Sequence, residues 1–159
     1  MVKILIVYDS RSDNTQKMAA AIAKGARTVK GTTVQIEKVD KTGLEDLLGA
    51  DGIIMGSPTY YGLMSGKLKA LLDESVKIHG KLEGKVGAAF TSSGGTATGA
   101  ETTLLSILQA MLVHGMVIQG RHDTKHYGAA AVGCPKSEEF ESCRNLGRRV
   151  AELAAKLKK

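Results

Sequence analysis

A polar segment at residues 9–15, DSRSDNT, follows an apolar run, and each of its side chains is a hydroxyl, an amide or a charged group. Ser10, Ser12, Asn14 and Thr15 supply neutral side-chain donors. Together with backbone N–H groups at the start of a helix, such donors can hold a terminal phosphate monoester. In the alternative interpretation, Ser12 or Asn14 only caps the helix and the other residues form a solvated turn. On this segment alone, neither interpretation is favoured.

Two further segments have an unusual composition. GSPTYYGLMSG, at residues 56–66, combines Pro58 with the adjacent Tyr60 and Tyr61, on which a flat heteroaromatic ring could stack. TSSGGTATGAE, at residues 91–101, has three glycines among small hydroxyl residues, so its backbone can approach a ligand closely and direct N–H groups at it. The alternatives are ordinary packing for the tyrosine pair and a flexible turn for the glycine segment.

Two common phosphate-binding motifs are absent from the sequence. GxGxxG does not follow the first apolar run, and GxxxxGK[ST] occurs nowhere. The segment from Gly62 to Lys67 has one residue too few for the second motif, and Leu68 stands where Ser or Thr is needed. A nucleoside triphosphatase is therefore not expected.

Short aliphatic runs alternate with longer segments of helical period along the chain. Buried strands read as near-continuous apolar runs, whereas an edge strand alternates. The sequence predicts strands at residues 3–8, 32–39, 51–56, 85–92 and 115–120, the last continued after a loop by 128–133. It predicts helices from Asn14 to a stop at Gly31, around 43–50, along 68–76, along 104–112, and from a cap at Ser137 to Leu157.

Strand followed by helix, repeated about five times, predicts an α/β fold with right-handed crossovers and a parallel sheet covered on both faces. Such a doubly wound sheet binds its ligand outside the carboxyl ends of its strands. The three unusual segments follow the first, third and fourth predicted strands, so we expect them to meet at this edge. Phosphate donors, a stacking surface and a backbone-rich clamp in one place fit a mononucleotide with a large ring.

Length and composition predict one domain, residues 1–159, in a cytoplasmic protein without a membrane-spanning segment or signal peptide. The net charge of +6 permits anionic cofactors and partners. Nucleic acid is not an expected partner, because the chain has no Trp, two Phe and four Tyr. Cys134 and Cys143, nine residues apart, fit neither a redox pair nor a zinc site, so we expect reduced thiols and no metal.

The sequence resembles flavodoxin-like proteins, and within them the FMN-dependent NAD(P)H:quinone oxidoreductases of the WrbA type. The segments that carry the resemblance are GSPTYYGLMSGKLKALLD, TSSGGTATGAETT and HGMVIQG, at residues 56–73, 91–103 and 114–120. The resemblance implies a three-layer fold with a five-stranded sheet in the order 2-1-3-4-5. It also implies FMN as cofactor, NADH or NADPH as electron donor and a quinone or another small electron acceptor.

The resemblance places the FMN phosphate at residues 10–15, the isoalloxazine beside residues 58–62, and its pyrimidine edge along residues 92–97. No catalytic side chain is implied, because the chemistry takes place at flavin N5. Backbone N–H groups of Gly94 and Gly95 are our candidates for stabilising the reduced ring. The residues implied in cofactor binding are Ser10, Arg11, Ser12, Asp13, Asn14, Thr15, Pro58, Thr59, Tyr60, Tyr61, Gly62, Ser92, Ser93, Gly94, Gly95, Thr96 and Ala97.

Some positions depart from the family pattern. Asp13 stands where the family has glycine, so we expect its backbone to be left-handed and its carboxylate to point away from the phosphate. Arg11 beside it is either a phosphate partner or a solvated surface residue. His79 stands where the family places a tryptophan near the quinone, and its alternative is an exposed helix end. His114 is interpreted as a helix-end residue rather than a flavin contact. Tyr127 resembles part of a loop that reaches toward a flavin site, either that of its own chain or that of a neighbouring chain.

A flavodoxin-type electron carrier that serves a protein redox partner is the alternative function. Such carriers are typically acidic to suit basic partners, and this chain is net positive, which favours the enzyme. A third hypothesis is an interaction module without flavin. The resemblance also implies a homo-oligomer, a dimer or tetramer, although the chain is a short form that lacks segments which often build oligomer contacts.

Overall fold

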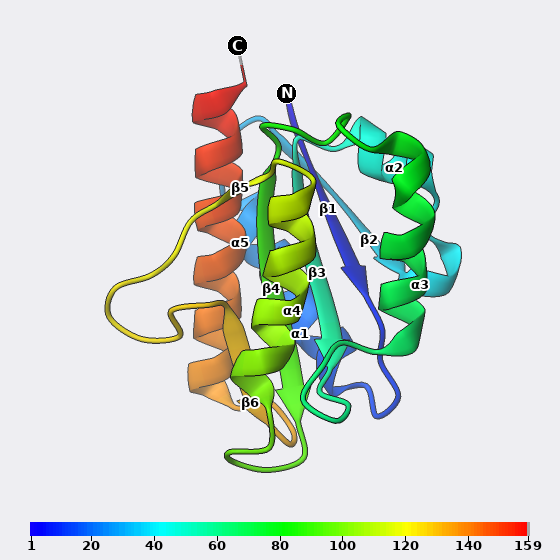
Figure 1. The fold of residues 1–159 in the computed structure, drawn as a ribbon. Helices are drawn as coiled ribbons and strands as arrows, with labels where there is room; N and C mark the ends of the chain where they lie inside the picture. The colour runs from blue at the N-terminus through cyan, green and yellow to red at the C-terminus, as the bar shows by residue number, and fades with distance from the viewer. Residues whose placement is uncertain (159) are drawn as a thin grey trace.

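One parallel sheet forms the middle layer of the molecule (Figure 1). The structure is a computed structural model in which residues 1–158 are described. Neighbouring strands lie in the order β2-β1-β3-β4-β5, with β6 also paired to β4, so the predicted order is confirmed. All of these pairings are parallel. The strands are β1 (Val2–Tyr8), β2 (Thr32–Lys38), β3 (Gly52–Pro58), β4 (Val86–Ser93), β5 (Val117–Ile118) and β6 (Ala129–Val132).

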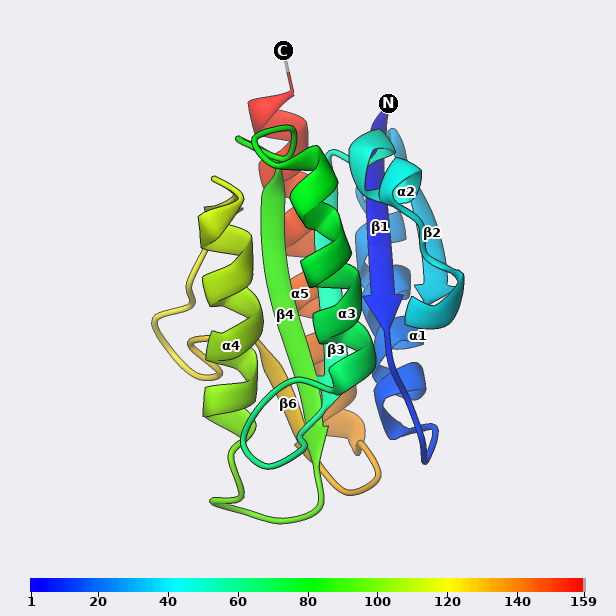
Figure 2. The same cartoon turned by 45° about the vertical axis from the view of Figure 1, so that its right-hand side comes forward.

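Helices cover both faces of the sheet, which confirms the predicted three layers (Figure 2). α1 and α5 lie on one face, and α2, α3 and α4 lie on the other. In β1, Ile4 and Ile6 pack toward the first pair, whereas Leu5 and Val7 pack toward the second set. This double burial is why the strand reads as an unbroken apolar run. The helices are α1 (Asn14–Arg27), α2 (Leu44–Gly49), α3 (Gly66–Glu74), α4 (Ala100–Val113) and α5 (Ser137–Leu157), with 3₁₀ turns η1 (Val39–Lys41) and η2 (Ser75–Ile78).

The fifth strand is interrupted. Of the predicted strand 115–120, only Val117–Ile118 pairs with β4. The chain then leaves the sheet and returns as β6, which pairs with the other end of β4. The intervening residues 119–128, QGRHDTKHYG, are mostly polar, charged or glycine and cannot fill a buried strand. The continuation by residues 128–133 is confirmed, whereas the predicted length of the first half is wrong.

α5 begins without the serine cap that the sequence predicts. Ser137 is its first helical residue, and Lys136 holds the cap position. The Glu139 carboxylate accepts a hydrogen bond from the backbone N–H of Lys136 at 2.9 Å. A glutamate at the third helical position satisfies this donor by reaching back to it. The acidic first turn, rather than Ser137, therefore closes the start of the helix.

α5 is amphipathic along its 21 residues. Leu146 and Val150 are buried against the sheet side, whereas Arg148 and Glu152 form an exposed ion pair at 3.0 Å. Within residues 1–158, no helix is long and apolar enough to cross a membrane.

Candidate functional site

Three loops meet at the carboxyl edge of the sheet: a first loop (9–13), a second loop (59–65) and a third loop (94–99). The Thr59 N–H donates to Ser92 O at 2.8 Å, and the Thr15 and Ser92 hydroxyls lie 2.9 Å apart. The predicted convergence is therefore confirmed. The loops enclose a cavity of about 440 Å³, the three-loop cavity, within the roughly 300–1,000 Å³ range of small-molecule sites. It is lined by Arg11, Ser12, Asn14, Pro58, Thr59, Tyr60, Ser92, Ser93, Gly94 and Gly133.

The first loop leaves the start of α1 without a side-chain cap. Neither Ser12 nor Asn14 caps the helix, and the nearest substitute is the Ser10 hydroxyl, which accepts from Gln16 N–H at 3.3 Å. Among residues 1–158, no acceptor is bonded to the backbone N–H groups of residues 12–15. Free N–H groups at a helix start carry the positive end of the helix dipole. This end of the cavity is therefore built for an anion.

Asp13 occupies the cap position in the left-handed conformation, with φ of 64°, as predicted. Its side chain is exposed, and it is not among the residues that line the three-loop cavity. Arg11 is also exposed but does line the cavity. The arrangement keeps the free N–H groups accessible while the nearby carboxylate is left in solvent.

Replacing Asp13 by Gly or Asn is expected to tighten phosphate binding several-fold at low ionic strength. A carboxylate about 6 Å from a phosphate dianion costs several kcal/mol at an effective dielectric of about 20, and solvent exposure reduces this cost. Both replacements tolerate the left-handed backbone. FMN titrations at low and high salt measure the effect, which should shrink as salt rises. Equal affinity of all three proteins at low salt would show that the carboxylate does not act on the site.

The second loop contains a tight hairpin. Tyr60 and Leu63 exchange two backbone hydrogen bonds, each of 3.0 Å. Tyr61 and Gly62 between them both have positive φ, 49° and 75°, as in a two-residue hairpin of the I′ type. Tyr60 lines the three-loop cavity, whereas Tyr61 is fully exposed at the tip. The two tyrosines therefore do not form one stacking surface, and only Tyr60 is placed to contact a bound ring.

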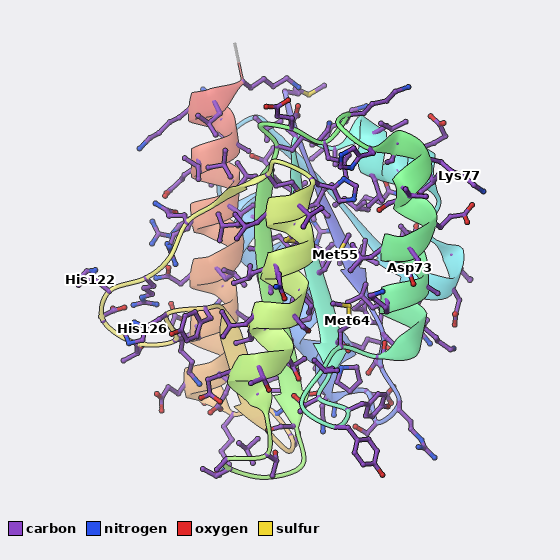
Figure 3. All side chains as sticks on the ribbon, viewed as in Figure 1. Met55, Met64, Asp73, Lys77, His122 and His126 are labelled. Atoms are coloured by element: carbon purple, nitrogen blue, oxygen red, sulfur yellow. The ribbon has the colours of Figure 1, made fainter. Side chains whose placement is uncertain are left out.

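The second loop is anchored at its far end. Met64, labelled in Figure 3, is partly buried against the core cluster that contains Met55 of β3, and its N–H donates to the Ser106 hydroxyl of α4 at 3.3 Å. The Ser65 N–H donates to the Ser57 hydroxyl at 2.7 Å, and the Ser65 hydroxyl in turn caps α3. Because both ends are fixed, the hairpin that carries Tyr60 is held over the cavity.

The third loop divides its predicted residues between two cavities. Ser93 lines both, and Gly94 lines the three-loop cavity. Gly95, Thr96 and Ala97 line a second cavity of about 290 Å³, whose opposite wall contains Lys125 to Gly128. His126 is one of these lining residues, and Figure 3 shows it in the loop between β5 and β6. Tyr127 therefore lines the second cavity and not the three-loop cavity.

Backbone strain gathers in these loops. Within residues 1–158, four non-glycine residues have positive φ. Asp13, Tyr61 and Ala97 lie one in each of the three loops, and Lys125 lies in the wall of the second cavity. Strain of this kind persists where surrounding structure enforces it and is typical of binding sites. The loops are thus fixed in shape before any ligand is bound.

His79 and His114 lie at the opposite edge of the sheet from the three loops. His114 ends α4, and His79 follows η2 just before β4 begins. Their rings are 5.9 Å apart, and neither residue lines the three-loop cavity. The prediction of His79 as a substrate-pocket residue is not supported within one chain, because α3 and α4 run antiparallel to the strands and end far from the loops. The helix-end interpretation of His114 is confirmed.

His114 is buried, and its two ring nitrogens have different surroundings. Its Nε2 lies 2.7 Å from the Ser75 hydroxyl, which donates to Leu72 O at 2.6 Å and so accepts from Nε2–H. Its Nδ1 is buried without a partner among residues 1–158. Burial, followed by the charge of His79, lowers the pKa of His114.

Stability is expected to fall as the pH drops below about 6.5, the ordinary pKa of histidine. The pKa of His114 is lowered by folding, so its contribution is complete above that pH and is lost as the pH falls through the folded pKa. Urea unfolding of the parent and of His114→Gln between pH 5 and 8 measures this term. A stability difference between the two proteins that does not change with pH would contradict it.

Sequence reasoning missed Gly133. Its N–H donates to Ser93 O at 2.8 Å, and it lines the three-loop cavity from the end of β6. Its position in the sequence could have indicated it. Gly133 directly follows the predicted strand continuation, and the carboxyl end of that strand lies at the same sheet edge as the three loops.

A family model described as NADPH-dependent FMN reductase matches residues 41–124, more than half of the chain. The matched range contains the second and third loops. The chain belongs to this family of FMN-binding, flavodoxin-like oxidoreductases. The likeness to flavodoxin-like proteins extends over the remainder of the fold, which includes the first loop.

Individual relatives agree with this family. A flavodoxin of Aquifex aeolicus is 45% identical and covers 98% of this chain and 88% of its own. An NAD(P)H dehydrogenase (quinone) of Archaeoglobus fulgidus is 37% identical and covers 99% and 100%. The crystal structure of a flavodoxin, WrbA-like protein from Agrobacterium tumefaciens superposes with a TM-score of 0.86 at 28% identity, covering 99% and 100%. The resemblance to the WrbA type is confirmed. The alignment with the Archaeoglobus protein spans 191 positions, whereas the present chain has 159 residues, so the present chain is the shorter of the two.

Proposed function

We propose that the chain is an FMN-dependent NAD(P)H dehydrogenase that reduces quinones, with FMN held in the three-loop cavity. The observation that carries the proposal is the uncapped start of α1, where Ser12 and Asn14 line a cavity that Tyr60 and Gly94 also line. Family membership supports FMN as the cofactor and a nicotinamide as the donor.

The donor set of the cavity fits a flavin mononucleotide. Backbone N–H groups of residues 12–15 and the hydroxyl of Ser12 suit the phosphate, and Arg11 can add a positive charge. Tyr60 offers a ring face at the other end. Gly94 is open, with no atom within 4 Å of the position of an added Cβ, so its backbone can approach a ring edge. We therefore propose the residues of the three-loop cavity as the cofactor site.

When bound, FMN supplies hydride transfer between the nicotinamide and the acceptor. The residues of the chain bind and orient the cofactor rather than exchange protons with substrate. Backbone N–H groups of Gly94 and Gly95 are proposed to face the ring and stabilise negative charge. Gly94 lines the three-loop cavity and Gly95 lines the second cavity, so Gly94 is the better placed of the two.

A flavodoxin-type electron carrier is the second candidate, because the 45% identical relative from Aquifex aeolicus is named a flavodoxin. The net charge of +6 opposes this, since it does not suit a basic redox partner. An interaction module without flavin is a weaker candidate, because this function would leave the uncapped start of α1 and the three-loop cavity without a ligand.

Steady-state oxidation of NADH or NADPH by the FMN-loaded protein with a benzoquinone tests the enzyme. We expect turnover with at least one nicotinamide, and no neutral semiquinone to accumulate during anaerobic stepwise reduction. Failure with both nicotinamides, together with a strongly populated semiquinone, would establish the carrier instead. A protein that takes up no FMN would refute both flavin functions.

We further propose that the protein acts as a homo-oligomer, a dimer or tetramer, through the outer side of α4. Leu105, Leu112 and Val113 are 43%, 59% and 69% exposed. α4 carries one charged residue, Glu101, in 14 residues. A helix that is apolar on both sides is typical of one buried against a second surface. A nearly uncharged face also lets two copies of a chain with net charge +6 approach.

Leu112→Glu is expected to convert the assembly to monomers, because it places a charge in the proposed contact. Sedimentation equilibrium of the parent and the variant measures the change, and Ala20→Glu, at an exposed position of α1 on the other face of the sheet, is the control for added charge alone. An unchanged molecular mass of the Leu112 variant would exclude this face.

We also propose that residues 1–159 form one domain and that the protein is cytoplasmic. Cys134 and Cys143 are both free thiols. Burial raises the pKa of Cys143 to about 12, so it is not a reactive thiolate. Free thiols suit a reducing compartment.

A further inference from the structure

A buried threonine of β4 is hydrogen-bonded to a hydroxyl group of a residue that lines the three-loop cavity. Thr91, at 0% exposure near the end of β4, donates its hydroxyl hydrogen to Ser57 O at 2.7 Å. The same hydroxyl oxygen lies 2.9 Å from the hydroxyl of Thr59. Thr91 does not line the cavity, whereas Thr59 does.

The direction of the second hydrogen bond follows from the first. A hydroxyl has one hydrogen, and two oxygens at 2.7 Å need a hydrogen between them. Ser57 O cannot supply it, so the hydrogen of Thr91 is committed to that carbonyl. Thr59 must then donate to Thr91. The chain of donors runs from Thr59 to Thr91 to Ser57 O.

Thr59 is left with no donor for a ligand. Its hydroxyl hydrogen is used by Thr91, and its backbone N–H donates to Ser92 O at 2.8 Å. Its hydroxyl oxygen retains lone pairs on a side chain that lines the cavity. At this point the cavity can accept a hydrogen bond and cannot give one.

We propose that Thr91 is a positioning residue that fixes Thr59 as a hydrogen-bond acceptor, and that this acceptor receives an N–H or O–H group of the bound cofactor. This inference rests on the proposed function. The oxidised flavin ring has one N–H donor, at N3, and the ribityl chain has hydroxyl donors. Either donor can form the same kind of hydrogen bond to the Thr59 hydroxyl oxygen. A phosphate oxygen, which carries no hydrogen, is rejected at this position and directed to the free N–H groups of α1 instead.

A double-mutant cycle on FMN binding tests the inference by fluorescence titration of the apo-protein. Thr59→Val and Thr91→Val are each expected to raise the Kd for FMN about five- to tenfold, the size of one lost hydrogen bond. If Thr91 acts through Thr59, the double variant binds within about twofold of Thr59→Val. Thr91→Ser, which keeps the hydroxyl, should restore the parent Kd.

Ser75→Ala separates positioning from general destabilisation. Ser75 is also 0% exposed and donates to a backbone carbonyl, Leu72 O, but it lies at the opposite edge of the sheet. The Ser75→Ala variant should lower the apo-protein's melting temperature without changing the Kd for FMN. A parent-like Kd for Thr91→Val, or a double variant whose effect is the product of the single effects, would overturn the inference. A parent protein that binds no FMN would instead refute the proposed function.

FMN methylated at N3 distinguishes the two donor sources. If Thr59 accepts from the ring, Thr91→Val weakens FMN but leaves the methylated analogue unchanged. If it accepts from the ribityl chain, both ligands weaken by the same factor. Either result supports the acceptor role, and a variant that binds FMN more tightly than the parent contradicts it.

Discussion

Ser12→Glu is expected to weaken FMN binding at least about a hundredfold, or about 2.7 kcal/mol, while it stabilises the apo-protein. Ser12 is exposed, lines the three-loop cavity and stands at the uncapped start of α1. A carboxylate there can reach the free N–H groups that we assign to the phosphate, and it also repels a phosphate dianion. The same contact caps the helix, which is worth roughly 0.5–2 kcal/mol to the apo-protein.

The two opposite signs make this prediction specific. Fluorescence titration gives the Kd, and thermal unfolding of the apo-protein gives the stability. Ser12→Gln is the matched control, since it has the same shape without the charge and should lose much less affinity. A Ser12→Glu protein that binds FMN as tightly as the parent would show that the phosphate lies elsewhere.

Gly25→Ala is expected to destabilise the fold by about 3 kcal/mol, at the upper end of overpacking effects. An added Cβ at Gly25 would lie 1.9 Å from Arg144 O of α5. Gly147 of α5 makes the reciprocal approach, 2.0 Å from Ile22 O of α1. Backbone cannot move aside as a flexible side chain can, so α1 and α5 must separate. Urea unfolding measures the loss.

Gly49→Ala is the control for this effect. Gly49 ends α2, and no atom lies within 4 Å of its added Cβ. Alanine in a helix is favoured over glycine by up to about 1 kcal/mol, so this variant should be as stable as the parent or more stable. If Gly25→Ala were equally harmless, the close approach of α1 and α5 would be wrong. The position of the uncapped start of α1 would then also be wrong.

The sheet and its helices were predictable because burial leaves a local trace in the sequence. β1 reads as an unbroken apolar run since Ile4 and Leu5 face opposite covered sides. The left-handed backbone of Asp13 was predictable from the resemblance instead, because the family has glycine at this position and Asp is one of the few other residues that tolerate that conformation. The meeting of the three loops followed from the rule that parallel strands end at one edge.

The remaining features depend on contacts between residues far apart in the chain. The interruption of the fifth strand depends on which part of β4 each half pairs with. This pairing register cannot be read from the composition of the segment. The division of the third loop between two cavities depends on residues 125–128 behind it. His79 lies at the far edge because α3 and η2 before it run antiparallel to the strands. A resemblance at a single sequence position gives no information about this direction. Tyr60 and Tyr61 are separated by a hairpin turn, which the sequence Tyr-Tyr-Gly alone does not predict.

A crystal structure of the FMN complex tests the central claim most directly. We predict that the phosphate accepts hydrogen bonds from the backbone N–H groups of residues 12–15, with Asp13 still exposed and Tyr60 and Gly94 beside the ring. A phosphate bound outside the first loop, or an Asp13 carboxylate turned in to occupy those N–H groups, would contradict the assignment of this site.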